Sequence, residues 1–194
     1  MTSAEARALF ESAGALLRGH FILSSGRHSD TYLQCALVLQ DPRRAEALGR
    51  ALAERLRDTA PTVVVAPAGG GLLGAHEVAR ALGLCAVFAE REGGALRLRR
   101  GFGLSPGARA LVVEDVFTTG ASVRELAELV SAAGAQVTGV GCLVFRGDKV
   151  PDWSPRFEAL LEIEAPSWPA EQCPLERSGI AAVRPGSRGL AVTK

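Results

Sequence analysis

Hydrophobic and polar positions follow two patterns along the chain, a helical pattern at the start and a strand–helix alternation from residue 62 onward. Apolar residues recur at helical spacing between residues 9 and 17, and Thr2 with Glu5 three residues later is typical of a capped helix start. Asp41-Pro42 also indicates a helix start, because proline is preorganised for the first helical position. The expected elements of this part are helices at 2–18 and 41–58 and extended segments at 20–23 and 31–39.

The second pattern alternates apolar, β-branched runs with helical segments. The expected elements are strands at 62–66, 85–90, 110–114, 136–145 and 159–164, helices at 72–82 and 122–133, loops at 67–71 and 116–120, and one side of a hairpin at 96–100. Strands joined through helices become parallel neighbours with right-handed crossovers. The alternation therefore predicts an α/β fold, with a mostly parallel sheet flanked by helices. The tail at 169–178 is expected to form a short helix or an irregular cap.

Composition narrows the class of protein. Apolar residues make up 47% of the 194 residues, charged residues 22%, and the net charge is +1, which suits one globular domain and argues against a dedicated nucleic-acid binder. No apolar run approaches the roughly 18 residues of a membrane span, and the N-terminus lacks a signal-peptide pattern, so no membrane partner and a cytoplasmic location are expected. The four cysteines are far apart, which predicts neither a zinc site nor a disulfide framework, and Cys85 and Cys142 are expected in the core.

Candidate chemistry concentrates in the segment Leu111–Ser122. An apolar strand ends in Glu114 and Asp115, and a Thr-Thr-Gly turn leads into a helix. Ligands of open parallel sheets lie beyond the carboxyl ends of the strands, where this turn is expected. Free amides of the turn and the helix N-terminus suit a phosphate, and Gly120 permits the tight turn.

The two acids call for a different partner. Ionised carboxylates only accept hydrogen bonds and repel a phosphate, so Glu114 and Asp115 are expected to face sugar hydroxyls or a magnesium ion. A phosphate cup beside two hydroxyl acceptors describes a site for ribose 5-phosphate. An ordinary surface turn capped by Ser122 is the plain alternative, and the combination of strand, acid pair, Thr-Thr-Gly and helix start argues against it.

This segment resembles the motif with which type I phosphoribosyltransferases bind phosphoribosyl pyrophosphate (PRPP). The resemblance implies that Glu114 and Asp115 bind the ribose hydroxyls, with Asp115 also catalytic. It implies that the loop residues bind the 5-phosphate, namely Val116, Phe117, Thr118, Thr119, Gly120, Ala121 and Ser122. The glycine turn with Gly69 and Gly70 is expected to bind pyrophosphate through backbone amides.

Two further stretches resemble the orotate phosphoribosyltransferases, and most closely the short variant typical of Thermus. Residues 19–34 look like the hood segment that covers the base in that family, and Arg146 follows a strand where the family places an orotate-binding arginine. An arginine can meet a carboxylate with two parallel hydrogen bonds, which suits orotate. Thr118 matches a second orotate contact. Tyr32 could stack on the base, and His20 and His28 could act as ligands or as structural parts of the hood.

The family carries a mobile catalytic loop at the arginine- and glycine-rich segment 90–103. Arg91 and Arg99 are expected to be catalytic there, with Arg97 and Arg100 as further cations, although the usual lysines and histidine are absent. The family's hood lysine is replaced by Ser24, and the turn at 68–71 also lacks a lysine. A solvated hairpin edge protected by arginines is the alternative for this segment.

The resemblance implies the full set of expectations for function. The whole chain is expected to be one phosphoribosyltransferase domain, with residues 1–40 and the C-terminal tail as a hood over a core at 41–150. The expected reaction joins orotate to PRPP, before UMP formation, in a homodimer with shared active sites. Magnesium is expected as a cofactor carried by PRPP, without direct protein ligands. The alternatives are a purine or uracil phosphoribosyltransferase and a non-catalytic PRPP- or nucleotide-sensing regulator.

Overall fold

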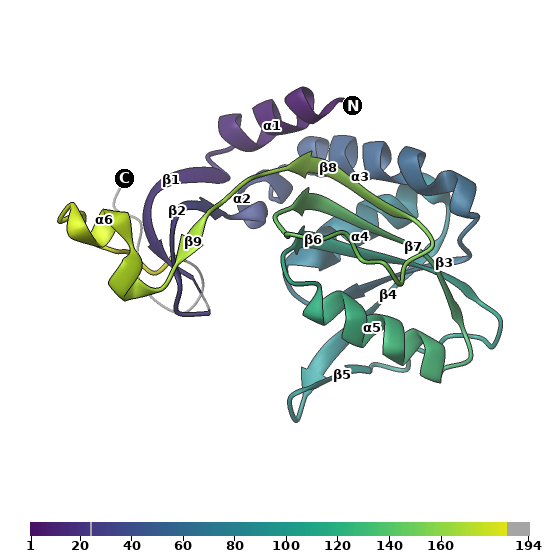
Figure 1. Ribbon diagram of the computed structural model, residues 1–194. Coiled ribbons are helices and arrows are strands. Elements are labelled where there is room, and N and C mark those ends of the chain that lie inside the picture. Colours follow the sequence, from purple (N-terminus) through teal and green to yellow (C-terminus); the bar gives the residue numbers. More distant parts are fainter. Residues whose placement is uncertain (24, 186–194) are drawn as a thin grey trace.

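A six-stranded sheet forms the centre of the computed structural model, which describes residues 1–23 and 25–185 (Figure 1). The strand order is β5-β4-β3-β6-β7-β8. The strands are β3 (Val63–Pro67), β4 (Cys85–Glu92), β5 (Ala95–Leu98), β6 (Arg109–Phe117), β7 (Gln136–Phe145) and β8 (Phe157–Glu162). All neighbours pair in parallel except β5, which runs antiparallel to β4. The predicted α/β class is confirmed.

Helices cover both faces of this sheet. These are α3 (Pro42–Leu56), with a 3-10 turn at Arg57–Thr59, and α4 (Gly70–Leu82) on one face and α5 (Ala121–Ala132) on the other. The other described helices are α1 (Ser3–Ser12), α2 (Cys35–Leu39), a 3-10 turn at Ala170–Gln172 and α6 (Pro174–Arg177). Successive strand residues face opposite layers: Val64 packs with the cluster around α3 and α4, and Val65 with the cluster around α5. Burial on both faces explains the unbroken apolar runs of these strands. No helix in the described ranges is long and apolar enough to cross a membrane.

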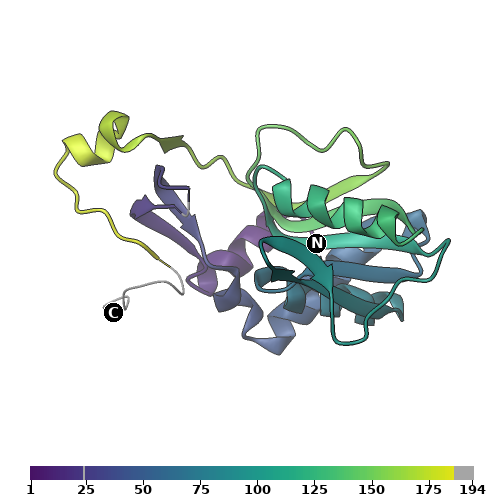
Figure 2. The ribbon, with the colours of Figure 1, turned by 90° about the horizontal axis from the view of Figure 1, so that it is seen from below.

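A second, smaller sheet stands apart from the first (Figure 2). Strands β1 (Leu16–Ile22) and β2 (His28–Leu33) pair antiparallel, and β2 pairs with β9 (Ser167–Trp168) from the tail. The tail then returns alongside β1, where the Val183 amide donates to the His20 carbonyl at 2.9 Å. We call the β1–β2 hairpin together with the tail at residues 166–185 the hood. Helix α1 is not part of the hood, because it packs against β8 of the large sheet.

Two expectations for the N-terminal region are wrong. The first helix ends at Ser12, and residues 16–18 belong to β1, because Gly14 takes a φ of +64° and β2 supplies a pairing partner. Residues 35–39 form helix α2 and not a strand. An apolar run this short has no decisive periodicity, and packing of Val38 against the core selects the helix.

Two smaller expectations also need correction. Strand β6 continues through Phe117 into the expected loop, because Val116 and Phe117 still pair with Val144 and Phe145 of β7. Cys85 is exposed at the start of β4, whereas Cys142 is buried as expected. Ser24 lies outside the described residues.

Candidate active site

The acid pair lies at the carboxyl end of β6, against the first turn of α4. A methyl group added to Gly70 would lie 2.0 Å from Asp115 Oδ2, and one added to Gly71 would lie 2.8 Å from Glu114 Oε1. Only glycine therefore allows the α4 backbone to approach the two carboxylates this closely. The turn preceding α4 also depends on glycine, because Gly69 has a φ of +121°. The structure thus brings the glycine turn and the acid pair into one site.

Local hydrogen bonds hold the two carboxylates. Glu114 Oε1 accepts from the Asp115 amide at 3.2 Å, and Asp115 Oδ1 accepts from the Val116 amide at 2.9 Å. Burial, reinforced by the charge of Asp115, raises the pKa of Glu114 far above the usual carboxyl range. The site therefore favours a ligand that donates hydrogen bonds or positive charge to these oxygens.

The predicted phosphate turn surrounds a small cavity of about 60 Å³ next to Glu114. Its wall runs from Val116 through Val123. Among the described residues, the amides of Thr118, Thr119, Gly120 and Ser122 donate no hydrogen bond to a protein acceptor, while the Ala121 amide reaches Thr119 Oγ1 at 3.4 Å. Four free donors at the start of α5 make a suitable anion site.

Gly120 shapes this turn. Its φ is +74°, and an added methyl group would lie 2.5 Å from Cζ of the buried Phe117 ring. Phe117 packs edge-to-face on Phe157, and the core allows it little room to move. The Thr-Thr-Gly sequence is therefore needed both for its backbone conformation and for its lack of a side chain.

Gly120→Ala is expected to abolish productive phosphate binding at this turn, because the methyl group must displace either Phe117 or the turn. Gly134→Ala is the matched control: Gly134 also has a φ of +74°, but its added methyl group would lie 3.7 Å from Pro106, an ordinary contact. Both variants lose about 1–2 kcal/mol of stability to left-handed strain. Steady-state kinetics should show a loss of catalytic efficiency with PRPP only for Gly120→Ala, and equal losses would contradict this role.

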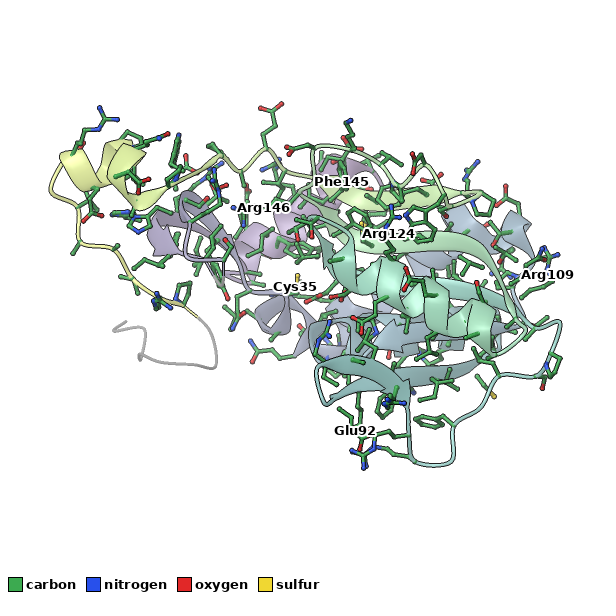
Figure 3. All side chains as sticks on the ribbon, turned by 60° about the horizontal axis from the view of Figure 1, so that its bottom comes forward. Cys35, Glu92, Arg109, Arg124, Phe145 and Arg146 are labelled. Carbon is green, nitrogen blue, oxygen red and sulfur yellow. The ribbon has the colours of Figure 1, made fainter. Side chains whose placement is uncertain are left out.

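Arg146 lies just beyond β7, where the large sheet meets the hood (Figure 3). Its Nη2 donates to Ser29 Oγ of β2 at 2.9 Å and to the Ala165 carbonyl at 3.4 Å. Burial lowers the pKa of Arg146, which a nearby charge on Asp30 partly offsets. No carboxylate within the described residues lies within 4.0 Å of its guanidinium, so this half-buried cation is well placed for an anionic ligand.

The Arg146 loop also adjoins the phosphate turn. The Arg146 amide donates to the Phe117 carbonyl at 2.8 Å, and a methyl group added to Gly147 would lie 2.4 Å from the Thr118 carbonyl oxygen. Burial raises the pKa of Tyr32 on β2, and smaller contributions come from Cys35 and Asp115. Ser29, which orients Arg146, was not predicted as a site residue, although it lies in the segment 19–34 that resembles the family's hood.

The arginine-rich segment forms the β4–β5 hairpin at the edge of the large sheet. Each predicted cation is paired with a glutamate: Arg91 with Glu125 at 2.9 Å, Arg100 with Glu90 at 2.9 Å, Arg99 with Glu92 at 3.4 Å and Arg97 with Glu92 at 3.8 Å. This arrangement matches the edge-protection alternative. A catalytic role for Arg91 or Arg99 requires these ion pairs to open, and it stays a prediction.

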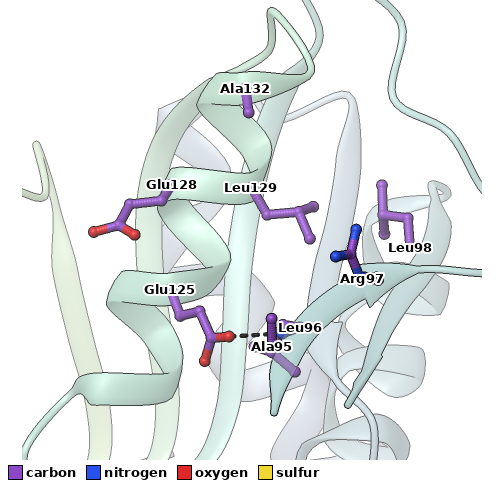
Figure 4. Close-up of a pocket in the computed structure, with 8 residues that line it drawn as sticks. All are labelled: Ala95, Leu96, Arg97, Leu98, Glu125, Glu128, Leu129 and Ala132. Carbon is purple, nitrogen blue, oxygen red and sulfur yellow. Dashed lines mark hydrogen bonds between the residues drawn. The ribbon is translucent and has the colours of Figure 1, made fainter. Parts of the chain in front are cut away.

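A larger hollow of about 620 Å³ lies between β5 and α5 (Figure 4). Its wall combines leucine and alanine side chains with Arg97, Glu125 and Glu128, and the Leu96 amide donates to Glu125 Oε1 at 2.6 Å. Two carboxylates make it a poor place for a phosphate. The small cavity with free amides fits the expected chemistry better.

Comparisons with known proteins agree with this geometry. The family described as phosphoribosyl transferase domain matches residues 37–176. An orotate phosphoribosyltransferase of Pelotomaculum thermopropionicum is 53% identical over 98% of this chain and 100% of its own length, and one of Caldanaerobacter subterraneus is 49% identical over 94% and 96%. The crystal structure of orotate phosphoribosyltransferase from Aeropyrum pernix superimposes with a TM-score of 0.69 at 27% identity, covering 82% of this chain and 93% of that one.

Proposed function

The chain belongs to the phosphoribosyltransferases, and within them to the orotate phosphoribosyltransferases, so we propose that it joins orotate to PRPP, giving orotidine 5'-phosphate and pyrophosphate. The observation that carries this proposal is the shared site at the end of β6. It combines two carboxylates, a turn of free amides and a half-buried arginine that has no carboxylate partner among the described residues.

We assign the parts of PRPP to the parts of the site by their chemistry. The free amides of Thr118, Thr119, Gly120 and Ser122 hold the 5-phosphate, and Glu114 and Asp115 accept hydrogen bonds from the ribose hydroxyls. The backbone at Gly70 lies against Asp115, and the position of a Gly69 side chain is open space, so the amides of Gly69 and Gly70 are assigned to pyrophosphate beside the sugar.

Arg146 selects and orients the base. Its guanidinium offers parallel donors to the orotate carboxylate, and Ser29 and the Ala165 carbonyl fix its direction. The ring nitrogen of orotate then attacks the anomeric carbon as pyrophosphate leaves from the opposite face. Catalysis here consists of positioning and charge stabilisation, and no side-chain nucleophile is required.

Three further expectations remain proposals. Magnesium would arrive bound to PRPP, without direct protein ligands, and would neutralise part of the pyrophosphate charge. A homodimer with shared sites rests on the family resemblance, and restored activity on mixing an Arg146 variant with an Arg91 variant would support it. A cytoplasmic location stays a prediction from the sequence.

The activity is tested by the loss of orotate absorbance on addition of PRPP and magnesium. Turnover of orotate, with adenine, guanine and uracil unused, is the expected result. Consumption of one of those bases in place of orotate would favour the purine or uracil alternative. PRPP binding without turnover of any base would favour a regulator built on this fold.

Glu114→Gln is expected to stabilise the ligand-free protein increasingly as pH rises. Because the raised pKa keeps a proton on Glu114 in the folded state, the unfolded chain binds fewer protons, and stability is lost as pH rises from about 4.3 towards the raised pKa. Glutamine removes this titration. The difference in melting temperature between variant and wild type should grow between about pH 5 and about pH 8, whereas exposed Glu128→Gln should show no such growth. A constant difference would contradict the buried carboxyl.

A further inference from the structure

Three buried side chains from distant parts of the sequence meet in the hood. His20 lies on β1, His28 on β2 and Cys173 just before α6, and the ligand atoms they offer all lie within 4.8 Å of one another. The exposed fractions of the three residues are 3%, 6% and 0%. Figure 1 shows α6 and β9 of the tail beside the β1–β2 hairpin. The cluster therefore ties the two ends of the chain together.

His20 presents a free lone pair to the cluster. Its Nδ1 lies 2.6 Å from the Ile180 carbonyl oxygen, and because a carbonyl only accepts hydrogen bonds, Nδ1 carries the ring proton. In this tautomer of the neutral ring, Nε2 carries the lone pair and faces the other side chains. A histidine whose second nitrogen donates to a backbone carbonyl is the usual arrangement of a metal ligand.

A fourth side chain joins at the surface. Glu176 Oε2 lies 3.5 Å from His20 Nε2 and 3.4 Å from His28 Nδ1, and its side chain is 56% exposed. Cys173 Sγ lies 3.4 Å and His28 Nδ1 2.7 Å from the same His20 Nε2. With Glu176 Oε2, three groups therefore surround the one lone pair of this nitrogen. Hydrogen bonding can satisfy that lone pair with one good donor, whereas a shared cation satisfies all four groups at once.

The spacing and chemistry of these atoms fit zinc. Tetrahedral zinc with bonds of about 2.0–2.1 Å to N or O and about 2.3 Å to S places its ligands roughly 3.3–3.6 Å apart. Three of the contacts made by His20 Nε2 and His28 Nδ1 match this spacing. The two imidazole nitrogens, 2.7 Å apart, need to separate slightly, and the widest pair of the cluster, up to 4.8 Å apart, needs to close. A thiolate and a carboxylate together neutralise a divalent cation. We propose that His20, His28, Cys173 and Glu176 bind a structural Zn²⁺ ion.

The ion would stabilise a part of the protein that has little core of its own. Strand β9 contributes two residues to the small sheet, and α6 has four. Binding of a metal to a preformed set of ligands adds directly to folding stability. Ser29, the neighbour of His28 on β2, holds Arg146, so the same ion would also steady the hood side of the active site. The sequence predicts no zinc site, because the four cysteines lie far apart along the chain.

The proposal is tested on the full-length protein without substrates, and so independently of the proposed activity. Wild-type protein from zinc-supplemented medium should contain about one zinc per chain by elemental analysis. Chelation should lower its melting temperature, and added Zn²⁺ should restore it. Replacement by Co²⁺ should give the charge-transfer absorption of a thiolate–cobalt bond. Less than a tenth of an equivalent after incubation with Zn²⁺, with an unchanged melting temperature, would overturn the proposal.

Variants then identify the ligands. Cys173→Ser and His28→Gln should each lose bound zinc, and the cobalt–thiolate band should disappear in Cys173→Ser. Cys85→Ser removes an exposed thiol on β4 and should retain both signals. Wild-type metal content in Cys173→Ser would contradict the assignment. The chelation experiment on wild-type protein keeps the proposal falsifiable if either variant fails to fold.

Discussion

Arg146→Ala is expected to raise the Michaelis constant for orotate about a hundredfold and to leave that for PRPP nearly unchanged. A hydrogen-bonded charge pair contributes about 2–3 kcal/mol, equivalent to a factor of roughly a hundred in binding. The arginine is half-buried and has no carboxylate partner within the described residues, so its charge is available to the substrate. Steady-state kinetics with each substrate varied in turn measures the effect.

Two further variants sharpen this test. Arg146→Lys keeps the charge but loses the parallel donors, and it should restore only part of the orotate affinity. Arg50→Ala removes the same charge from the exposed face of α3 and should leave both Michaelis constants unchanged. Equal weakening of orotate and PRPP in Arg146→Ala would instead indicate a general disturbance where the hood meets the sheet.

Asp115→Asn is expected to lower catalytic efficiency with PRPP by roughly a hundredfold, because an amide replaces an ionised acceptor with a weaker one and turns a donor towards the sugar hydroxyls. Hydrogen bonds to charged groups are about twice as strong as neutral ones, which sets this size. Asparagine has nearly the same shape, and the contact with the α4 turn at Gly70 should survive. Kinetics with PRPP as the varied substrate, together with a melting curve, separates chemistry from folding.

Asp58→Asn provides the matched control for this substitution. Asp58 is exposed and lies in the 3-10 turn before the amino end of β3, whereas the acid pair lies at the carboxyl end of the neighbouring parallel strand β6. The same loss of one negative charge there should leave PRPP use unchanged. If Asp115→Asn behaves like Asp58→Asn, the ribose-binding role is wrong.

Local patterns determined much of the large sheet. The β6–turn–α5 segment could be predicted because its strand, acid pair, glycine turn and helix start lie within twelve residues, and the free amides around Gly120 follow directly from that order. The capping box of Thr2 and Glu5 was also visible, and the structure forms it. Chain order alone was enough for features whose parts are neighbours in sequence.

The hood shows why other features could not be predicted. Residues 16–18 continue a helical pattern, yet they form a strand because β2 pairs with them. Arg146 meets Ser29 across 117 positions, and Cys173 meets His20 across 153. No periodicity connects residues so far apart. Their meeting depends on how the tail folds back over the N-terminal hairpin.

The sequence by itself determined the α/β class and the strand-to-helix turn that forms the candidate sugar-phosphate site, because alternating burial and such a turn are local properties. Only the tertiary structure decided what surrounds that site. It placed Gly70 and Gly71 against the carboxylates, gave Arg146 its orienting partner and gathered the hood cluster. Each of these contacts forms only when separate elements pack together. Their packing energy depends on residues from several segments, whereas the hydrophobic periodicity of a helix or strand can be recognised within one segment.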